Sequence, residues 1–306
     1  MVEYKRAVLS AFIIFFSGVT LLRAQTLPSL LVSSDAVGMG TALTTVGKCG
    51  GAFSLENNAA SMAFIDGKVS AGASFGLWQP SYAEDMILGL GVACKISERL
   101  ALGIQGKSFG QHSYDIVTES GSVKSTFTPK DLAFGMGAAY AVTDFLSVGI
   151  AGRLVKSTLS EDASATVLGI DAGLFLKKNA LSAGLSINNF GSKVNYGKGS
   201  YTQPSMLKAG VAYTFGRTEG HSVTPSAEVD YLLSGGLMAG LGLEYSMKEF
   251  LYVRCGYHYG DDSQVIPSFA SVGLGLKRYG ANIDISYIVM SEVLAGSLGI
   301  SLGYSF

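Results

Sequence analysis

Apolar residues alternate with small or polar residues along most of the chain from about residue 68 onward. From Leu298 to Phe306 every even position is apolar or aromatic, and every odd position is Gly or Ser. Successive side chains of a strand point to opposite faces, so a period of two predicts strands with one apolar face. The same period recurs from Leu237 to Tyr245 and from Ile283 to Val289. Alternation alone does not decide whether the apolar face meets a dry core or lipid.

The composition of the chain favours a barrel whose apolar face is in contact with lipid. Charged residues make up only 15% of the chain, Gly occurs 40 times, and the mean hydropathy is +0.35. After residue 24 no stretch of about 20 apolar residues could form a membrane-spanning helix. A hydrophobic exported chain without such helices can still enter a membrane if its strands pair with one another and close into a barrel. The alternative is a soluble all-β protein with Gly-rich turns.

The N-terminus has the layout of a secretory signal peptide. Lys5 and Arg6 precede an almost wholly apolar run from Ala7 to Leu22, and Ala24 offers a cleavage site. We therefore expect residues 1–24 to be a signal peptide that exports the chain, and we expect the mature chain to reside in the cell outer membrane. An uncleaved membrane anchor is the alternative.

The alternation and the turn residues predict an all-β fold, a transmembrane antiparallel β-barrel of about 14 strands over residues 68–306. The strands are expected near residues 68–78, 85–96, 99–112, 131–142, 145–158, 165–177, 180–190, 205–215, 224–233, 237–247, 250–259, 268–277, 281–290 and 294–306. An even count is typical of single-chain bacterial barrels, as are short turns at one end and longer loops at the other. This pattern places both chain ends in the periplasm.

Residues 25–67 do not alternate, so they form a separate segment in this prediction. They include Asp35 to Ala42 and the run Asn57, Asn58, Ala59 and Ala60. The segment is too polar to meet lipid and too apolar to be a free tail. About eight strands already suffice for side chains to fill a barrel, so fourteen leave space inside. We expect residues 25–67 to fold into that space as a small N-terminal plug; a partly ordered periplasmic strap is the alternative.

Charged side chains occur on the face opposite the apolar one, as a barrel with a polar lumen requires, because a charge on the lipid face is costly. The candidate lumen residues are Lys208, Glu228, Asp230, Glu244, Arg254, His258 and Asp284, with Lys107, Arg153 and Asp171 on the same face earlier in the chain. They could form a structural network that keeps the wall rigid and the interior hydrated, or they could contact a substrate.

The sequence offers no catalytic arrangement, metal site or cofactor motif. His112, His221 and His258 are not spaced as metal ligands. The chain has only three cysteines, Cys49, Cys94 and Cys255. Such a small, odd number does not indicate a disulfide framework. With a net charge of −1 and no basic stripe, nucleic acid is not an expected partner.

The chain resembles the FadL-like outer-membrane barrels and, within them, the PorV/PorQ branch of Bacteroidota. The stretches that carry the resemblance are Asp35 to Ala42, Asn57 to Ala60, Leu185 to Gly191, Gln203 to Gly210, Ala227 to Tyr231, Gly242 to Tyr245 and Leu251 to Tyr257. The resemblance implies a fourteen-stranded barrel with an N-terminal plug.

The resemblance also implies two functions. PorV-like members serve the type IX secretion system, which would make secretion-system proteins or secreted cargo the partners, beside outer-membrane lipid. FadL-like members carry small hydrophobic molecules through an opening in the wall. A barrel enzyme is a third hypothesis, and it predicts a Ser or carboxylate beside a hydrogen-bonded His near the outer rim.

Overall fold

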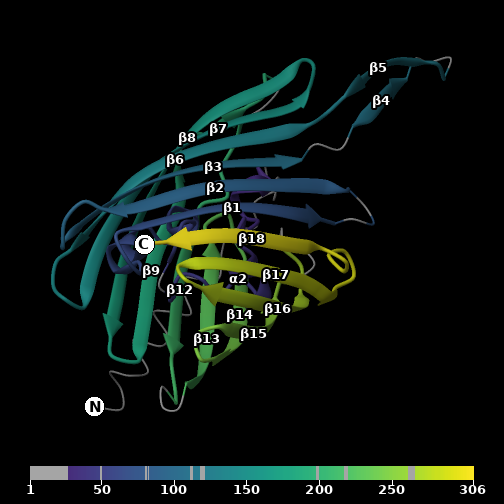
Figure 1. The fold of residues 1–306 in the computed structure, drawn as a ribbon. Helices are drawn as coiled ribbons and strands as arrows, with labels where there is room; N and C mark the ends of the chain where they lie inside the picture. Colours follow the sequence, from purple (N-terminus) through teal and green to yellow (C-terminus); the bar gives the residue numbers. More distant parts are fainter. Residues whose placement is uncertain are drawn as a thin grey trace, which may run out of the picture.

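In the computed structural model, antiparallel strands close into a barrel around an N-terminal segment that lies inside it (Figure 1). The structure describes residues 27–48, 50–79, 81, 83–110, 113–117, 121–197, 200–216, 220–260 and 266–306. The predicted signal peptide, Cys49 and His112 lie outside the described residues.

Fourteen strands form the wall, and each pairs with its two neighbours along the chain. In order they are β1 (Val69–Trp78), β2 (Asp85–Lys95), β3 (Leu100–Gly110), β6 (Lys130–Ala141), β7 (Leu146–Ser160), β8 (Ala163–Lys178), β9 (Leu181–Gly191), β12 (Met206–Tyr213), β13 (His221–Leu232), β14 (Leu237–Met247), β15 (Leu251–Tyr259), β16 (Phe269–Arg278), β17 (Ala281–Met290) and β18 (Leu298–Ser305). The barrel closes where β18 pairs with β1, with Ser305 opposite Ser70. The predicted barrel, its strand count and its antiparallel order are confirmed.

Two small hairpins outside the wall were not predicted. β4 (Tyr114–Val117) pairs with β5 (Val123–Phe127) inside the connection between β3 and β6. β10 (Val194–Asn195) pairs with β11 (Ser200–Tyr201) inside the connection between β9 and β12. The β4–β5 hairpin projects from the barrel at the upper right of Figure 1. Strands this short leave too few alternating residues to be recognised in the sequence.

The two ends of the barrel differ. One end, which we call the turn end, carries both β1's first residue and β18's last, together with tight turns such as 179–180 and 279–280. The other end, the loop end, carries most of the long connections, including both small hairpins. The β7–β8 connection is an exception, because only residues 161–162 separate these strands at the loop end. Short turns mark the periplasmic side of such barrels, so the turn end is periplasmic.

The apolar parity faces outward, as predicted. Leu90, Leu168 and Leu241 are 65%, 62% and 64% exposed, although they lie in the middle of long strands. Polar and small residues of the opposite parity are buried. Aromatic side chains cluster at the turn end, where Phe306 is 65% exposed, as in the aromatic girdle of a membrane barrel. Separately, none of the helices in the described part of the chain is long and apolar enough to cross a membrane.

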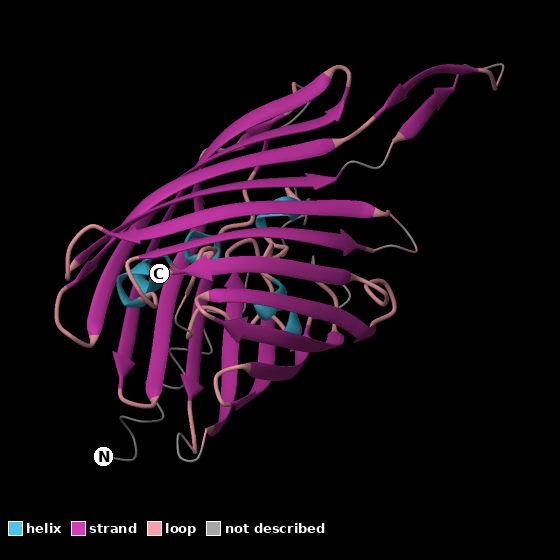
Figure 2. Cartoon of the chain, viewed as in Figure 1, coloured by secondary structure: helices cyan, strands magenta, loops and turns pink. Residues whose placement is uncertain are grey.

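Residues 27–67, here called the inner segment, lie within the lumen as short helical turns joined by loops (Figure 2). The turns are η1 (Pro28–Leu30), α2 (Ala36–Gly40), α3 (Ser54–Asn57) and η2 (Ala59–Phe64). α2 packs against β15 to β18, and η2 packs against the opposite wall from β2 to β8. The inner segment therefore spans the lumen from one side of the wall to the other.

Lumen-facing glycines allow the inner segment to approach the wall closely. A Cβ atom added at Gly149 would overlap the backbone of Ala60, and one added at Gly184 would overlap the carbonyl of Val46. Gly removes this side chain, so backbone can pack on backbone. Many of the glycines in the strand pattern thus serve the contact between wall and inner segment.

Candidate functional site

The charged residues predicted for the lumen do point inward, and most are buried. The buried ones are Lys107, Asp171, Glu228, Asp230, Arg254, His258 and Asp284. Charges removed from water are tolerated only when they are paired and hydrogen-bonded. Their partners in the structure therefore show what these residues hold in place.

Glu228 ties the inner segment to the wall. Its Oε2 accepts hydrogen bonds from the backbone N–H groups of Thr45 and Val46, at 2.7 and 2.8 Å. Lys208 lies between Glu228 and Asp230, with Nζ 3.2 Å from the first carboxylate and 3.1 Å from the second. This three-residue cluster shares one lysine between two carboxylates and fixes the position of a bend in the inner segment.

A second cluster is centred on Arg254, on β15, one of the strands against which α2 packs. Its guanidinium is 2.6 Å from Glu244 of β14 and 2.6 Å from Asp284 of β17. One cation on β15 therefore joins three strands of the wall. α2 lies directly against these strands, and its first helical amide, that of Ala36, donates to Ser301 Oγ at 2.8 Å. The five charges predicted on β12 to β15 and the one on β17 thus fall into two ion-pair groups.

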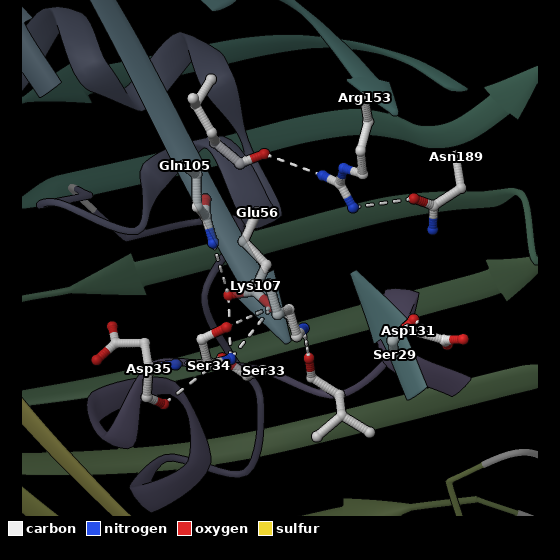
Figure 3. Close-up of polar contacts among 12 residues, drawn as sticks. Ser29, Ser33, Ser34, Asp35, Glu56, Gln105, Lys107, Asp131, Arg153 and Asn189 are labelled. Atoms are coloured by element: carbon white, nitrogen blue, oxygen red, sulfur yellow. Dashed lines mark hydrogen bonds and ion pairs between the residues drawn. The ribbon is translucent and has the colours of Figure 1, made fainter. Parts of the chain in front are cut away.

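A third cluster was only half predicted. Lys107, on β3, forms a buried ion pair with Glu56 of the inner segment and also donates to the carbonyl of Val32 (Figure 3). Glu56 accepts from the Ser34 amide as well, at 3.0 Å. One signal could have identified Glu56: between residues 36 and 65, Glu56 and Lys48 are the only charged residues. A lone charge in an apolar segment predicts a buried partner.

Arg153 braces an irregular part of the wall. The pairing of β8 with β9 changes register between Ile170 and Ala172. Arg153 contacts Asp171, which lies within this shift, at 2.7 Å. It also donates to Asn189 Oδ1 at 3.1 Å and to the carbonyl of Leu55 at 3.2 Å (Figure 3). Asn189 has a φ of 59°, in the left-handed region that Asn adopts more readily than most residues, and this conformation allows the backbone of β9 to bend at the bulge.

The four predicted plug residues are in contact with the wall at several points. Asn58 caps η2 by accepting from the Ala60 amide at 3.1 Å, and its Nδ2 donates to the Leu174 carbonyl at 2.9 Å. Ser147 donates to the Ala60 carbonyl at 2.7 Å, and Asn188 donates to the Asn57 carbonyl at 3.2 Å. Ala59 is buried next to them.

His258 takes part in packing. It is 2% exposed and stacks on Phe269, with ring centroids 5.0 Å apart. Within the described ranges, no three His, Cys, Asp or Glu side chains are grouped closely enough to hold a metal ion.

Cavities are unevenly distributed along the lumen. The two in the middle of the barrel, around Gln105 and around Asn188, have volumes of about 20 Å³ each, which is room for about one water molecule. Two larger cavities of about 680 and 280 Å³ lie at the turn end, and both reach Asp66 and Lys277. Their walls carry charged and hydroxyl side chains. In the described part of the lumen, the largest cavities therefore lie at the periplasmic end.

Besides Asp66, two charged residues of the inner segment, Asp35 and Lys48, border these cavities. Burial raises the pKa of the Asp35 carboxyl from 3.8 to about 6, although the hydrogen bond from the Val37 amide works in the opposite direction. Burial lowers the pKa of Lys48, whose Nζ has no hydrogen-bond partner among the described residues.

Asp35 gives a test of the inner segment's environment. An acid whose pKa is raised in the folded state adds stability below pH 3.8 and loses that contribution as pH rises to about 6. We expect Asp35→Asn, which keeps an oxygen to cap α2, to be more stable than the parent at pH 7.5, with little gain at pH 3.5. Urea unfolding at both pH values measures this difference. A gain of equal size at both would show that Asp35 is solvated.

Among solved structures, the fold is similar to transporters and channels from other bacteria. For the Pseudomonas putida toluene transporter TodX the TM-score is 0.63 with 14% identity, covering 88% of this chain and 95% of that one. The CymD monoaromatic hydrocarbon channel gives 0.62 with 16% identity over 90% and 98%. A Pseudomonas aeruginosa FadL homologue gives 0.52 with 13% identity over 89% and 98%. At such identities the likeness concerns the fold alone.

The sequence itself matches one family. A family model described as "Type IX secretion system protein PorV" matches residues 21–236, which is more than half of the chain. No curated protein matches the chain in sequence.

Proposed function

The chain belongs to the PorV family of type IX secretion system proteins, and on that premise we propose that it binds polypeptides at the outer membrane rather than conducting small molecules. In this proposal it is a non-enzymatic component of protein secretion or surface attachment in a member of the Bacteroidota. Its partners are secretion-system proteins or the secreted cargo.

The main support is the tightly held inner segment. Glu228, Lys107 and Arg153 bind it from three different strands of the wall. In the described part of the lumen, the cavities around Gln105 and around Asn188 have room for about one water molecule each, and a cavity within the inner segment measures about 70 Å³. A protein whose task is to present loops and a rigid rim gains from a filled, immobile interior, because pre-organised surfaces lose less entropy on binding.

The alternative is transport of small hydrophobic molecules, and one observation favours it. A transporter with a side opening needs an irregular wall, and the register shift between Ile170 and Ala172 is such an irregularity. The same hypothesis requires an apolar pocket beneath the inner segment. The large cavities instead lie at the turn end, with Lys177, Glu244 and Lys277 in their walls. A hydrophobic ligand would be poorly matched to such walls.

The experiment is deletion of the gene, followed by mass spectrometry of proteins on the cell surface and in the medium. We expect exported proteins to be lost from the surface and restored by a plasmid-borne copy. Uptake of radiolabelled toluene by the same strains provides the comparison. Unchanged exported proteins together with reduced toluene uptake would reject the proposal in favour of transport.

A further inference from the structure

One strand of the wall has an unpaired edge. β8 pairs with β7 along nearly its whole length, from Ala163 to Leu176. On its other side, β8 pairs with β9 only from Gly169 onward. β7 and β8 continue together to the hairpin at the top of Figure 1. Residues 163–167 of β8 therefore have a neighbouring wall strand on one side alone.

The direction of the backbone groups on this edge can be assigned. The Leu168 carbonyl accepts from the Ser192 amide at 3.0 Å and from Gln203 Nε2 at 2.7 Å, so Leu168 points away from β7. In an antiparallel ladder, alternate residues direct both N–H and C=O to the same side. Ser164 and Thr166 must then point away from β7 as well. Among the described residues, none hydrogen-bonds to the outward backbone groups of these two.

The edge lies just beyond the lipid belt. Leu154 and Leu168 form the last outward apolar pair between β7 and β8, and they are 45% and 62% exposed. The next outward pairs toward the loop end are Lys156 with Thr166 and Thr158 with Ser164, all of them polar. A change from apolar to polar outward residues marks the boundary between lipid and water. Ser164 and Thr166 are thus presented to water at the cell surface.

The edge is also rigid, and its own residues carry none of the usual protection. Its inward residues Ala165 and Val167 are buried against Leu27, Leu30 and Val194, which fixes the strand from beneath. Residues 163–168 contain no Pro and no charged residue. Natural proteins usually protect an exposed edge with such residues, because an open edge pairs readily with another chain. An open edge without that protection is suited to receive a strand.

We propose that residues 163–167 of β8 are a docking edge for an extended segment of a polypeptide exported by the secretion system to which this family belongs. The segment adds to the wall as an extra strand beside β8, and its backbone bonds to Ser164 and Thr166. In this mode of binding, main-chain hydrogen bonds supply affinity, and contacts between neighbouring side chains supply specificity for the bound sequence. The inference rests on the proposed function and adds the place and manner of binding.

The test uses a pair of substitutions at one position. Thr166→Pro removes an N–H that the fold leaves unused, and Pro is tolerated where the missing N–H faces solvent. Thr166→Val changes the side chain and keeps the N–H. The probe is the purified exported protein whose surface level falls most in the deletion strain. We expect Thr166→Pro to weaken its binding to the detergent-solubilised barrel about tenfold, and Thr166→Val to leave binding unchanged.

Heat-modifiable migration on gels establishes that each variant is a folded barrel. If Thr166→Pro does not fold, hydrogen exchange of the parent protein replaces it, and binding of the probe must slow exchange at Ser164 and Thr166. Equal binding by the Pro and Val variants, or unchanged exchange at both amides, overturns the docking edge. If gene deletion leaves exported proteins unaffected, the proposed function fails first, so the two failures are distinguishable.

Discussion

Glu228→Ala is expected to release the inner segment and to destabilise the protein by about 3–5 kcal/mol, the usual cost of removing one partner from a buried ion pair. Glu228 accepts from the amides of Thr45 and Val46, and it also faces Lys208. Its removal leaves two backbone N–H groups without their partner. Asp230 alone then remains to balance a lysine whose side chain is only 9% exposed.

Trp78 allows this to be measured, because it is the only tryptophan in the chain and packs in an apolar cluster with Leu31 and Val32 of the inner segment. We expect the Trp78 emission of Glu228→Ala to shift to the red and its urea midpoint to fall. Glu228→Gln, which keeps one acceptor oxygen, should lose less stability. Asp66→Ala is the matched control, since Asp66 is 74% exposed beside Lys277 and such surface pairs contribute less than about 1 kcal/mol. Equal losses for Glu228→Ala and Asp66→Ala would contradict this role of Glu228.

Removal of residues 27–65 is expected to convert a closed barrel into an open channel. η2 and α2 bridge opposite walls, and a barrel of fourteen strands is wider than its own side chains can fill. Without the inner segment, Lys107, Arg153 and Glu228 would line a continuous aqueous path through the barrel.

Planar-bilayer recordings test this prediction. The truncated barrel should give stable current steps, and the intact protein should give none. Heat-modifiable migration and strand content by circular dichroism confirm that the truncated chain has folded. A folded truncated barrel that carries no current would show that the strands themselves, or the long loops, close the lumen.

The strand pattern could be predicted from the sequence because one physical rule acts on every residue of the wall. Lipid outside and a polar lumen inside impose a period of two, so that Leu241 is 64% exposed while its neighbour Gly242 is buried. The same rule placed Glu228 and Arg254 in the lumen, since a charge facing lipid would be costly.

The partners of those charges could not be predicted in the same way. Lys208 pairs across a hairpin with Glu228 and Asp230, and strand register sets that contact. Lys107 pairs with Glu56, 51 residues away along the chain, in a segment with no period to show its path. The register shift between Ile170 and Ala172 was also not predicted, because one extra residue in a strand leaves little trace in an alternating pattern.

The central claim is that the lumen charges hold the inner segment permanently in place, and amide hydrogen exchange at Thr45 and Val46 tests it most directly. Both amides donate to Glu228 inside the barrel. We predict that they exchange as slowly as the amides of paired wall strands such as β13 and β14. Exchange at the rate of an exposed loop, in a barrel whose strands remain protected, would contradict the claim.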